Sequence, residues 1–341
     1  MEINQGIQGL RFLMIFGVFL KHLYDITGFP YFVDSGARGV EFFFLLSGFL
    51  EGMIWYYKPN SGGATIWNRC AIFYREKVAK FYFLHILTFS LSIPLILSFS
   101  DKSIKELMIS GGLNLLLLNS WFSISKWSFN GVSWFLSSLC FCYLLTPLLS
   151  HFFSKKCLLS LSCIAVLFSA KLILDTIHYG YFFPPYRFIE FSIAFISGNL
   201  FLTTNLYGKI KGTKKLYGDV SQVTWLFLCI LSIIVGDKKW IPAEFMVPFT
   251  FLLISLFMNG CIRGILSNHY LVTLGNLGLP FFLCHYLVIQ YVNWFVDALF
   301  NIQATHRIIV VSLISLIIAL LFSVLLSKLN NYAYSFIRRI L

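Results

Sequence analysis

Long apolar segments follow one another along almost the whole chain, and this pattern constrains the fold more than any other feature. A helix that crosses a bilayer needs about 20 predominantly apolar residues. Of the 341 residues, 58% are hydrophobic and only 12% are charged, which is typical of proteins that reside in lipid. The chain is therefore predicted to be an all-α, polytopic transmembrane helix bundle with about ten spanning helices. The segments of suitable length are 7–28, 38–57, 80–99, 130–150, 157–176, 187–204, 222–236, 242–260, 270–297 and 306–329.

A further apolar run, 107–120, is short and is interrupted by Gly111, Gly112 and Asn114, so we expect a re-entrant or interfacial segment there. If this run does not cross, most loop cations lie on the side of the N-terminus, as the positive-inside tendency requires. We therefore expect both termini in the cytoplasm and the protein in the cytoplasmic (inner or plasma) membrane. Residues 1–341 are predicted to form one integral membrane domain, with no cleaved signal peptide and no appended soluble domain.

The net charge of +12 is explained by these basic loops, and no nucleic-acid-binding motif or basic patch with interleaved aromatics is visible. We therefore predict no nucleic-acid partner. The cysteines lie in or beside apolar segments without the paired spacing of a zinc site, and no metal site is predicted. They are Cys70, Cys140, Cys142, Cys157, Cys163, Cys229, Cys261 and Cys284.

The first apolar segment carries a stripe of polar side chains, which is costly in a membrane and therefore indicates a functional site. Arg11 and His22 are separated by about 20° around a helix axis and by about 16 Å along it, and Gln8 and Asp25 fall near the same face. A structural polar seam, with Arg11 paired to a carboxylate, is the alternative. In a functional site His22 would take a proton near neutral pH, Asp25 would orient its ring, and Arg11 would clamp a phosphate or an oxyanion.

Other charged residues in apolar segments have local explanations. Arg38 and Glu41 are one turn apart and are predicted to pair, as are Lys171 and Asp175. Glu51 lies deep in the second segment, and it is expected either to pair with Arg11 or Lys21 or to take part directly in the chemistry.

Two stretches of the sequence resemble motifs of the acyltransferase-3 family of membrane O-acyltransferases. The stretch IQGLRFLMIFGVFLKH carries that family's arginine and histidine as Arg11 and His22, and GVEFFFLLSGFL carries its acidic residue and serine as Glu41 and Ser47. Three later stretches match in order: SWFLSSLCFCYLLTPLL around Trp134, YRFIEF, and LGNLGLPFFLCHYLVI. The last two contain Arg187, Glu190 and His285. A basic pair before the third segment is met by Lys77 and Lys80 in place of arginines.

The resemblance implies transfer of an acyl group, most often acetyl, from cytoplasmic acyl-CoA (acetyl-CoA) to a hydroxyl of a glycan. That acceptor is a surface polysaccharide of the cell envelope, such as an O-antigen or capsule, or a lipid-linked saccharide. Arg75, Lys77 and Lys80 are then expected to hold CoA phosphates, while Arg11 and His22 guide and activate the transfer. His22 either takes the acceptor's proton or carries the acyl group, and both routes stay open.

Each of the remaining motif residues either takes part in the site, as the resemblance implies, or has a structural role. Arg187 and Glu190 suit a helix-end ion pair, Trp134 suits an interfacial belt, and His285 suits a satisfied bundle histidine. The competing function is a transporter or flippase without chemistry, although no internal repeat of the kind found in many transporters is visible. A structural partner subunit is disfavoured by the cost of the buried charges. A separate partner protein completing the transfer stays open.

Overall fold

The computed structural model describes residues 4–30, 35–57, 65–125, 127–153, 157–176, 180–239, 243–300 and 303–340. All regular secondary structure in these ranges is helical, which confirms the all-α prediction. The α-helices are α1 (Gln5–Thr27), α2 (Ser35–Tyr57), α3 (Ile66–Ala79), α4 (Tyr82–Phe99), α5 (Ile104–Leu115), α6 (Trp134–Phe153), α7 (Cys157–Thr176), α8 (Pro184–Thr203), α9 (Leu206–Lys211), α10 (Lys215–Lys239), α11 (Ala243–Ser255), α12 (Cys261–Leu266), α13 (His269–Asn276), α14 (Gly278–Leu299) and α15 (Ala304–Ile340). Two short 3₁₀ helices are η1 (Asn119–Trp121) and η2 (Gly131–Ser133).

Within the described ranges, 7 helices are long and apolar enough to cross a membrane: α1, α2, α4, α6, α10, α14 and α15. The protein is therefore a membrane protein, but the count of about ten crossings is not confirmed. Among the other predicted segments, α7 and α11 contain only shorter apolar stretches, Leu159–Leu174 and Phe245–Ser255. The run 107–120 falls on α5, whose 12 residues are too few to span.

One predicted segment, 270–297, is wrong as a single helix. The chain forms α13 and then α14, with Leu277 between them. Gly275 at the end of α13 lies against α1 so closely that an added Cβ would be 1.9 Å from the carbonyl oxygen of Gln8. Hydropathy cannot reveal this break, because both pieces are apolar and the division comes from packing on α1.

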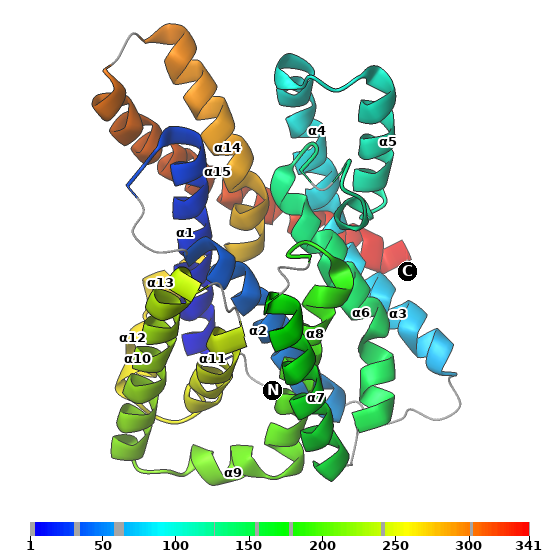
Figure 1. Ribbon diagram of the computed structural model, residues 1–341, viewed down its shortest axis with the longest axis vertical. Coiled ribbons are helices and arrows are strands. Elements are labelled where there is room, and N and C mark those ends of the chain that lie inside the picture. Colours follow the sequence, from blue (N-terminus) through cyan, green and yellow to red (C-terminus); the bar gives the residue numbers. More distant parts are fainter. Residues whose placement is uncertain are drawn as a thin grey trace.

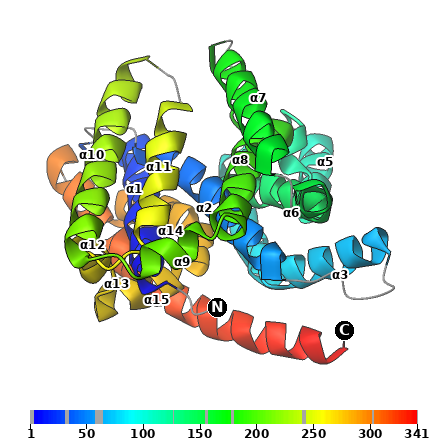
Figure 2. The same cartoon turned by 90° about the horizontal axis from the view of Figure 1, so that it is seen from below.

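Helix α2 packs most extensively on α8, and glycines set their separation. A Cβ on Gly52 would lie 2.0 Å from the carbonyl oxygen of Phe195, and a Cβ on Gly198 would lie 2.1 Å from that of Phe49. Small residues of this kind let helix backbones approach closely in membranes. Figure 1 shows α2 and α8 crossing in the middle of the molecule, with α1 beside α2 and α14 beside α1. In Figure 2, α3 and the C-terminal end of α15 extend from the bundle.

The close approach of α2 and α8 gives a stability prediction. Gly52→Ala should destabilise the protein by about 1–3 kcal/mol, because the new methyl meets backbone atoms that cannot move alone. The control is Gly112→Ala in α5, where an added Cβ meets nothing within 4 Å and alanine is the better helix former. Thermal unfolding in detergent should show a lower Tm for Gly52→Ala only. Equal Tm values for the two variants would contradict the tight contact.

Candidate active site

The polar stripe of α1 is present, and its partners differ from those expected. The Arg11 guanidinium donates to the side-chain oxygen of Gln8 at 2.9 Å, and it forms no ion pair within the described ranges. Glu51, expected beside Arg11 or Lys21, instead pairs with Lys77 of α3. Lys21 pairs with Asp25. Arg11 is therefore a cation within the bundle without a carboxylate partner among the described side chains.

Arg11 faces a cavity of about 410 Å³. Five residues singled out in the sequence meet there: Gln8, Arg11, Ser47, Lys77 and Lys80. The volume lies within the usual range of small-molecule sites. The full lining is Gln8, Arg11, Ile15, Phe43, Ser47, Lys77, Lys80, Phe81, Phe135, Leu136, Leu139, Tyr143, Gly275, Asn276, Gly278, Leu279 and Phe282.

Helix α3 supplies the two lysines of this cavity. The Lys77 amine, besides pairing with Glu51, lies 5.3 Å from the centre of the Tyr143 ring, a distance at which a cation is attracted to an aromatic face. Arg75 does not line the cavity. It is exposed and lies about 200° around the helix from Lys77. Tyr74 of α3 lies beside Cys140 of α6, and burial raises the pKa of its phenol.

His22 lies two turns beyond Ile15 on α1, and it meets α14. Its ring centre is 5.3 Å from that of His285 and 4.9 Å from that of Tyr286. Nδ1 of His22 is 3.6 Å from a carboxylate oxygen of Asp25, which agrees with the expected placement of Asp25 beside the ring. His22 is 15% exposed and Asp25 is 40% exposed, so the pair lies near an open edge of the bundle.

His285 is fully buried, and only one of its ring nitrogens is satisfied. Nδ1 lies 3.1 Å from the carbonyl oxygen of Phe281 and 2.7 Å from that of Phe282, so it must be the protonated nitrogen. Nε2 then carries a lone pair, and it is buried without a hydrogen-bond partner among the described residues. His285 is therefore not a structural histidine with both ring nitrogens hydrogen-bonded to the described residues.

The other motif residues gather in a separate buried charge cluster and do not line the cavity. The expected pair of Arg187 with Glu190 is present at 2.8 Å, but both side chains are completely buried rather than at an exposed helix end. Lys171 reaches Glu190 at 3.1 Å, and the side chain of Asp175 lies outside the described residues. Trp134 is buried, and its ring lies 5.7 Å from the Arg187 guanidinium, so it is not an interfacial belt residue.

The neighbouring pair of Arg38 and Glu41 is also confirmed, with contacts of 2.9 and 3.1 Å.

Sequence reasoning missed the residues that shape the cavity without carrying charge. Phe43, Phe135 and Phe282 are ordinary apolar residues in their segments, and no periodic signal separates them from the core. Among the described residues, no group of three histidine, cysteine or acidic side chains is placed to hold a metal ion.

Comparisons with known proteins give matches to acyltransferases. The chain is 26% identical over 328 residues to "Acyltransferase MdmB" of Streptomyces mycarofaciens, covering 84% of this chain and 79% of that protein. No solved structure shows a significant match. A family model described as "Acyltransferase domain" matches residues 4–328. Because that match covers nearly the whole chain, the protein belongs to the acyltransferase-3 family of membrane acyltransferases.

Proposed function

We propose that this acyltransferase moves an acyl group, most simply acetyl, from acyl-CoA to a hydroxyl of a surface or lipid-linked glycan. The observation that carries the proposal is the arrangement of α1. Its cavity end presents Arg11 beside Lys77 and Lys80, and His22 lies three turns further along the same face. The protein lies in the cytoplasmic membrane, with both termini and the basic end of the cavity on the cytoplasmic side, where acyl-CoA is available.

The basic end of the cavity suits an anionic donor. Arg11 has no carboxylate partner among the described side chains, and a planar guanidinium binds phosphate and carboxylate groups with two parallel hydrogen bonds. Because Lys77 pairs with Glu51, its positive charge is partly neutralised and it attracts an anionic donor less strongly than an unpaired lysine would. Lys80 ends α3 at the mouth of the cavity, a position suited to a CoA phosphate.

His22 is the proposed base. It takes the proton of the acceptor hydroxyl while the oxygen attacks the acyl carbon, the C–S bond breaks, and the CoA thiolate leaves and receives a proton. Asp25 favours the imidazolium that forms, and the His285 ring packs beside the His22 ring, with ring centres 5.3 Å apart, and so holds it in place. In the alternative route, His22 attacks the thioester itself and passes the acyl group on.

A direct assay tests this function against simple transport. Purified protein in lipid nanodiscs receives acetyl-CoA with and without a lipid-linked glycan, and free CoA and O-acetylated glycan are measured. Equal amounts of both products support direct or relayed transfer, and a single equivalent of CoA released without glycan supports the acyl-histidine route. Release of no CoA with any acyl donor would reject the proposed function.

The donor site gives a kinetic prediction for the lysine at the cavity mouth. Lys80→Ala should raise the KM for acetyl-CoA about tenfold with a smaller change in kcat, because loss of a binding contact removes uniform binding. Arg75→Ala, which removes an exposed charge on another face of α3, should raise KM less. Lys77→Ala is less informative alone, since it leaves the buried Glu51 carboxylate unpaired. A larger effect of Arg75→Ala would move the phosphate site out of the cavity.

A further inference from the structure

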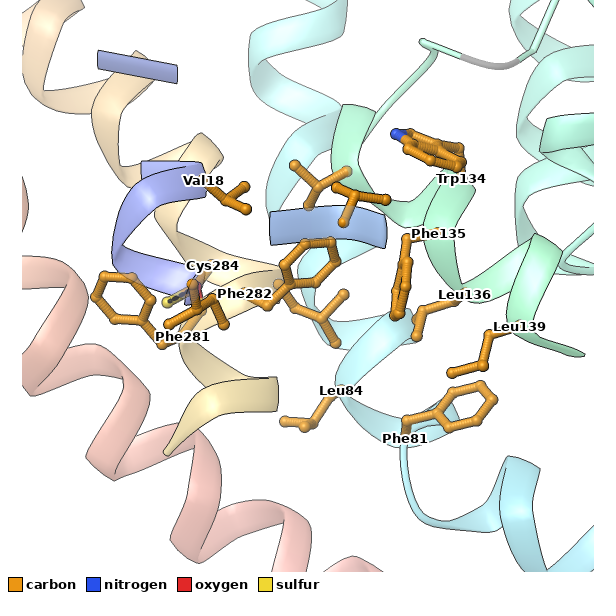
Figure 3. Close-up of a cluster of buried hydrophobic side chains, with 14 of the residues drawn as sticks. Val18, Phe81, Leu84, Trp134, Phe135, Leu136, Leu139, Phe281, Phe282 and Cys284 are labelled. Carbon is orange, nitrogen blue, oxygen red and sulfur yellow. Dashed lines mark hydrogen bonds between the residues drawn. The ribbon is translucent and has the colours of Figure 1, made fainter. Parts of the chain in front are cut away.

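The end of the cavity nearest the histidines is formed by three phenylalanines from three helices. Phe43 belongs to α2, Phe135 to α6 and Phe282 to α14, and all three line the cavity. Their ring centres are 5.1 Å apart for Phe135 and Phe282, 6.3 Å for Phe43 and Phe135, and 6.4 Å for Phe43 and Phe282. Figure 3 shows Phe282 and Phe135 facing each other across the space between α14 and α6. We call these three side chains the phenylalanine partition.

The partition lies between the cavity and the histidine pair. Along α14 the cavity lining ends at Phe282, and His285 follows one turn later, with its ring centre 5.9 Å from that of Phe282. Along α1 the lining ends at Ile15, and His22 follows two turns later. The cavity is thus basic toward Arg11 and aromatic toward the histidines.

Because the two ends of the cavity differ, only one part of a bound donor can lie against the phenylalanine partition. A donor whose phosphates lie near Arg11 and Lys80 must direct its thioester toward the aromatic end, because only that end approaches the histidines. The acyl chain is the apolar part of such a donor, and each methylene group that an apolar pocket does not fit changes discrimination by about 1–3 kcal/mol. Phe135 and Phe282 are buried, at 6% and 4% exposed, so a longer chain cannot be accommodated without moving them.

We propose that the phenylalanine partition selects the acyl group: it admits a short chain such as acetyl to the histidine pair and rejects longer saturated chains. This inference rests on the proposed acyl-CoA-dependent function and names the residues that determine its donor specificity. Phe282 is the member in direct contact with the His285 ring, so its side chain has the largest influence on what reaches the histidines.

The test measures kcat/KM for acetyl-CoA and hexanoyl-CoA with one glycan acceptor. Phe282→Ala should raise the hexanoyl-to-acetyl ratio at least about tenfold, because a ring is replaced by space for several methylene groups and each methylene changes discrimination appreciably. Phe282→Leu, a milder change that preserves folding if alanine does not, should raise the ratio less. The ratio, rather than the rate, is the readout, since either variant also alters packing beside His285.

Phe281→Ala is the matched control. Phe281 is the adjacent residue, is equally buried, and has its ring centre 5.9 Å from His285, but it does not line the cavity. Figure 3 shows it directed away from Phe135. Its variant should keep the wild-type ratio even if the rate falls. Unchanged ratios in both Phe282 variants, with wild-type acetyl transfer intact, would overturn the partition and leave the function standing. Absence of transfer by wild type with either donor would instead reject the function itself.

Discussion

His22→Ala is expected to lower the rate of glycan acylation by about 10²- to 10⁴-fold, the usual contribution of a general acid–base group. The reason is structural: His22 is the partly exposed member of the histidine pair, and it lies beside Asp25 at 3.6 Å. His285 is fully buried, so it is less accessible to an acceptor than His22 is. Acylated glycan is measured by mass spectrometry at equal amounts of purified protein.

Two further variants make this result specific. His151→Ala removes an exposed histidine from the last turn of α6, and it should retain wild-type acylation. His285→Ala should cost less than His22→Ala, and combining the two should add little, because groups that act as one unit are strongly non-additive. Near-normal acylation by His22→Ala, with normal abundance and Tm, would refute its assignment as the base and direct attention to His285.

Much of the fold follows from local sequence rules. Apolar length locates α1, α2, α4 and α6 within a few residues, because a spanning helix requires a fixed number of apolar positions. Periodicity places Arg11 and His22 on one face of α1 without knowledge of any neighbour. Spacing of three residues likewise predicts both buried ion pairs on α2 and α8, since these contacts lie within single helices.

The parts that sequence reasoning did not reach depend on how separate helices pack. The sequence offered Arg11 or Lys21 as the partner of Glu51, whereas the position of α3 against α2 brings Lys77 to it instead. The meeting of His22 with His285 likewise requires α1 and α14 to be neighbours.

Arg11 is the most informative residue to change, because the packing of the helices leaves it without an acidic partner among the described residues. An arginine in a helix bundle normally has an acidic partner, because an unpaired buried charge costs several kcal/mol. Here the described structure gives Arg11 only the Gln8 side-chain oxygen, at 2.9 Å, and the cavity. The energetic cost is consistent with an anionic ligand that completes the site when it binds. Such a ligand must offer oxygen atoms, since guanidinium nitrogens are hydrogen-bond donors only.

Arg11→Lys is therefore expected to reduce kcat/KM for acetyl-CoA about 10- to 10²-fold, because a charge-assisted hydrogen bond to a donor phosphate is worth about 1.5–3 kcal/mol. Lysine keeps the charge but lacks the planar fork that orients two oxygen atoms at once. Arg307→Lys is the control, because Arg307 pairs with Asp297 near the surface at 2.5 Å and a lysine can maintain such a pair. Steady-state kinetics should show the loss for Arg11→Lys alone. If Arg11→Lys matched wild type while Arg11→Ala lost activity, charge rather than oriented hydrogen bonding would be the contribution of this residue. If both variants were fully active, the cavity would not be the donor site.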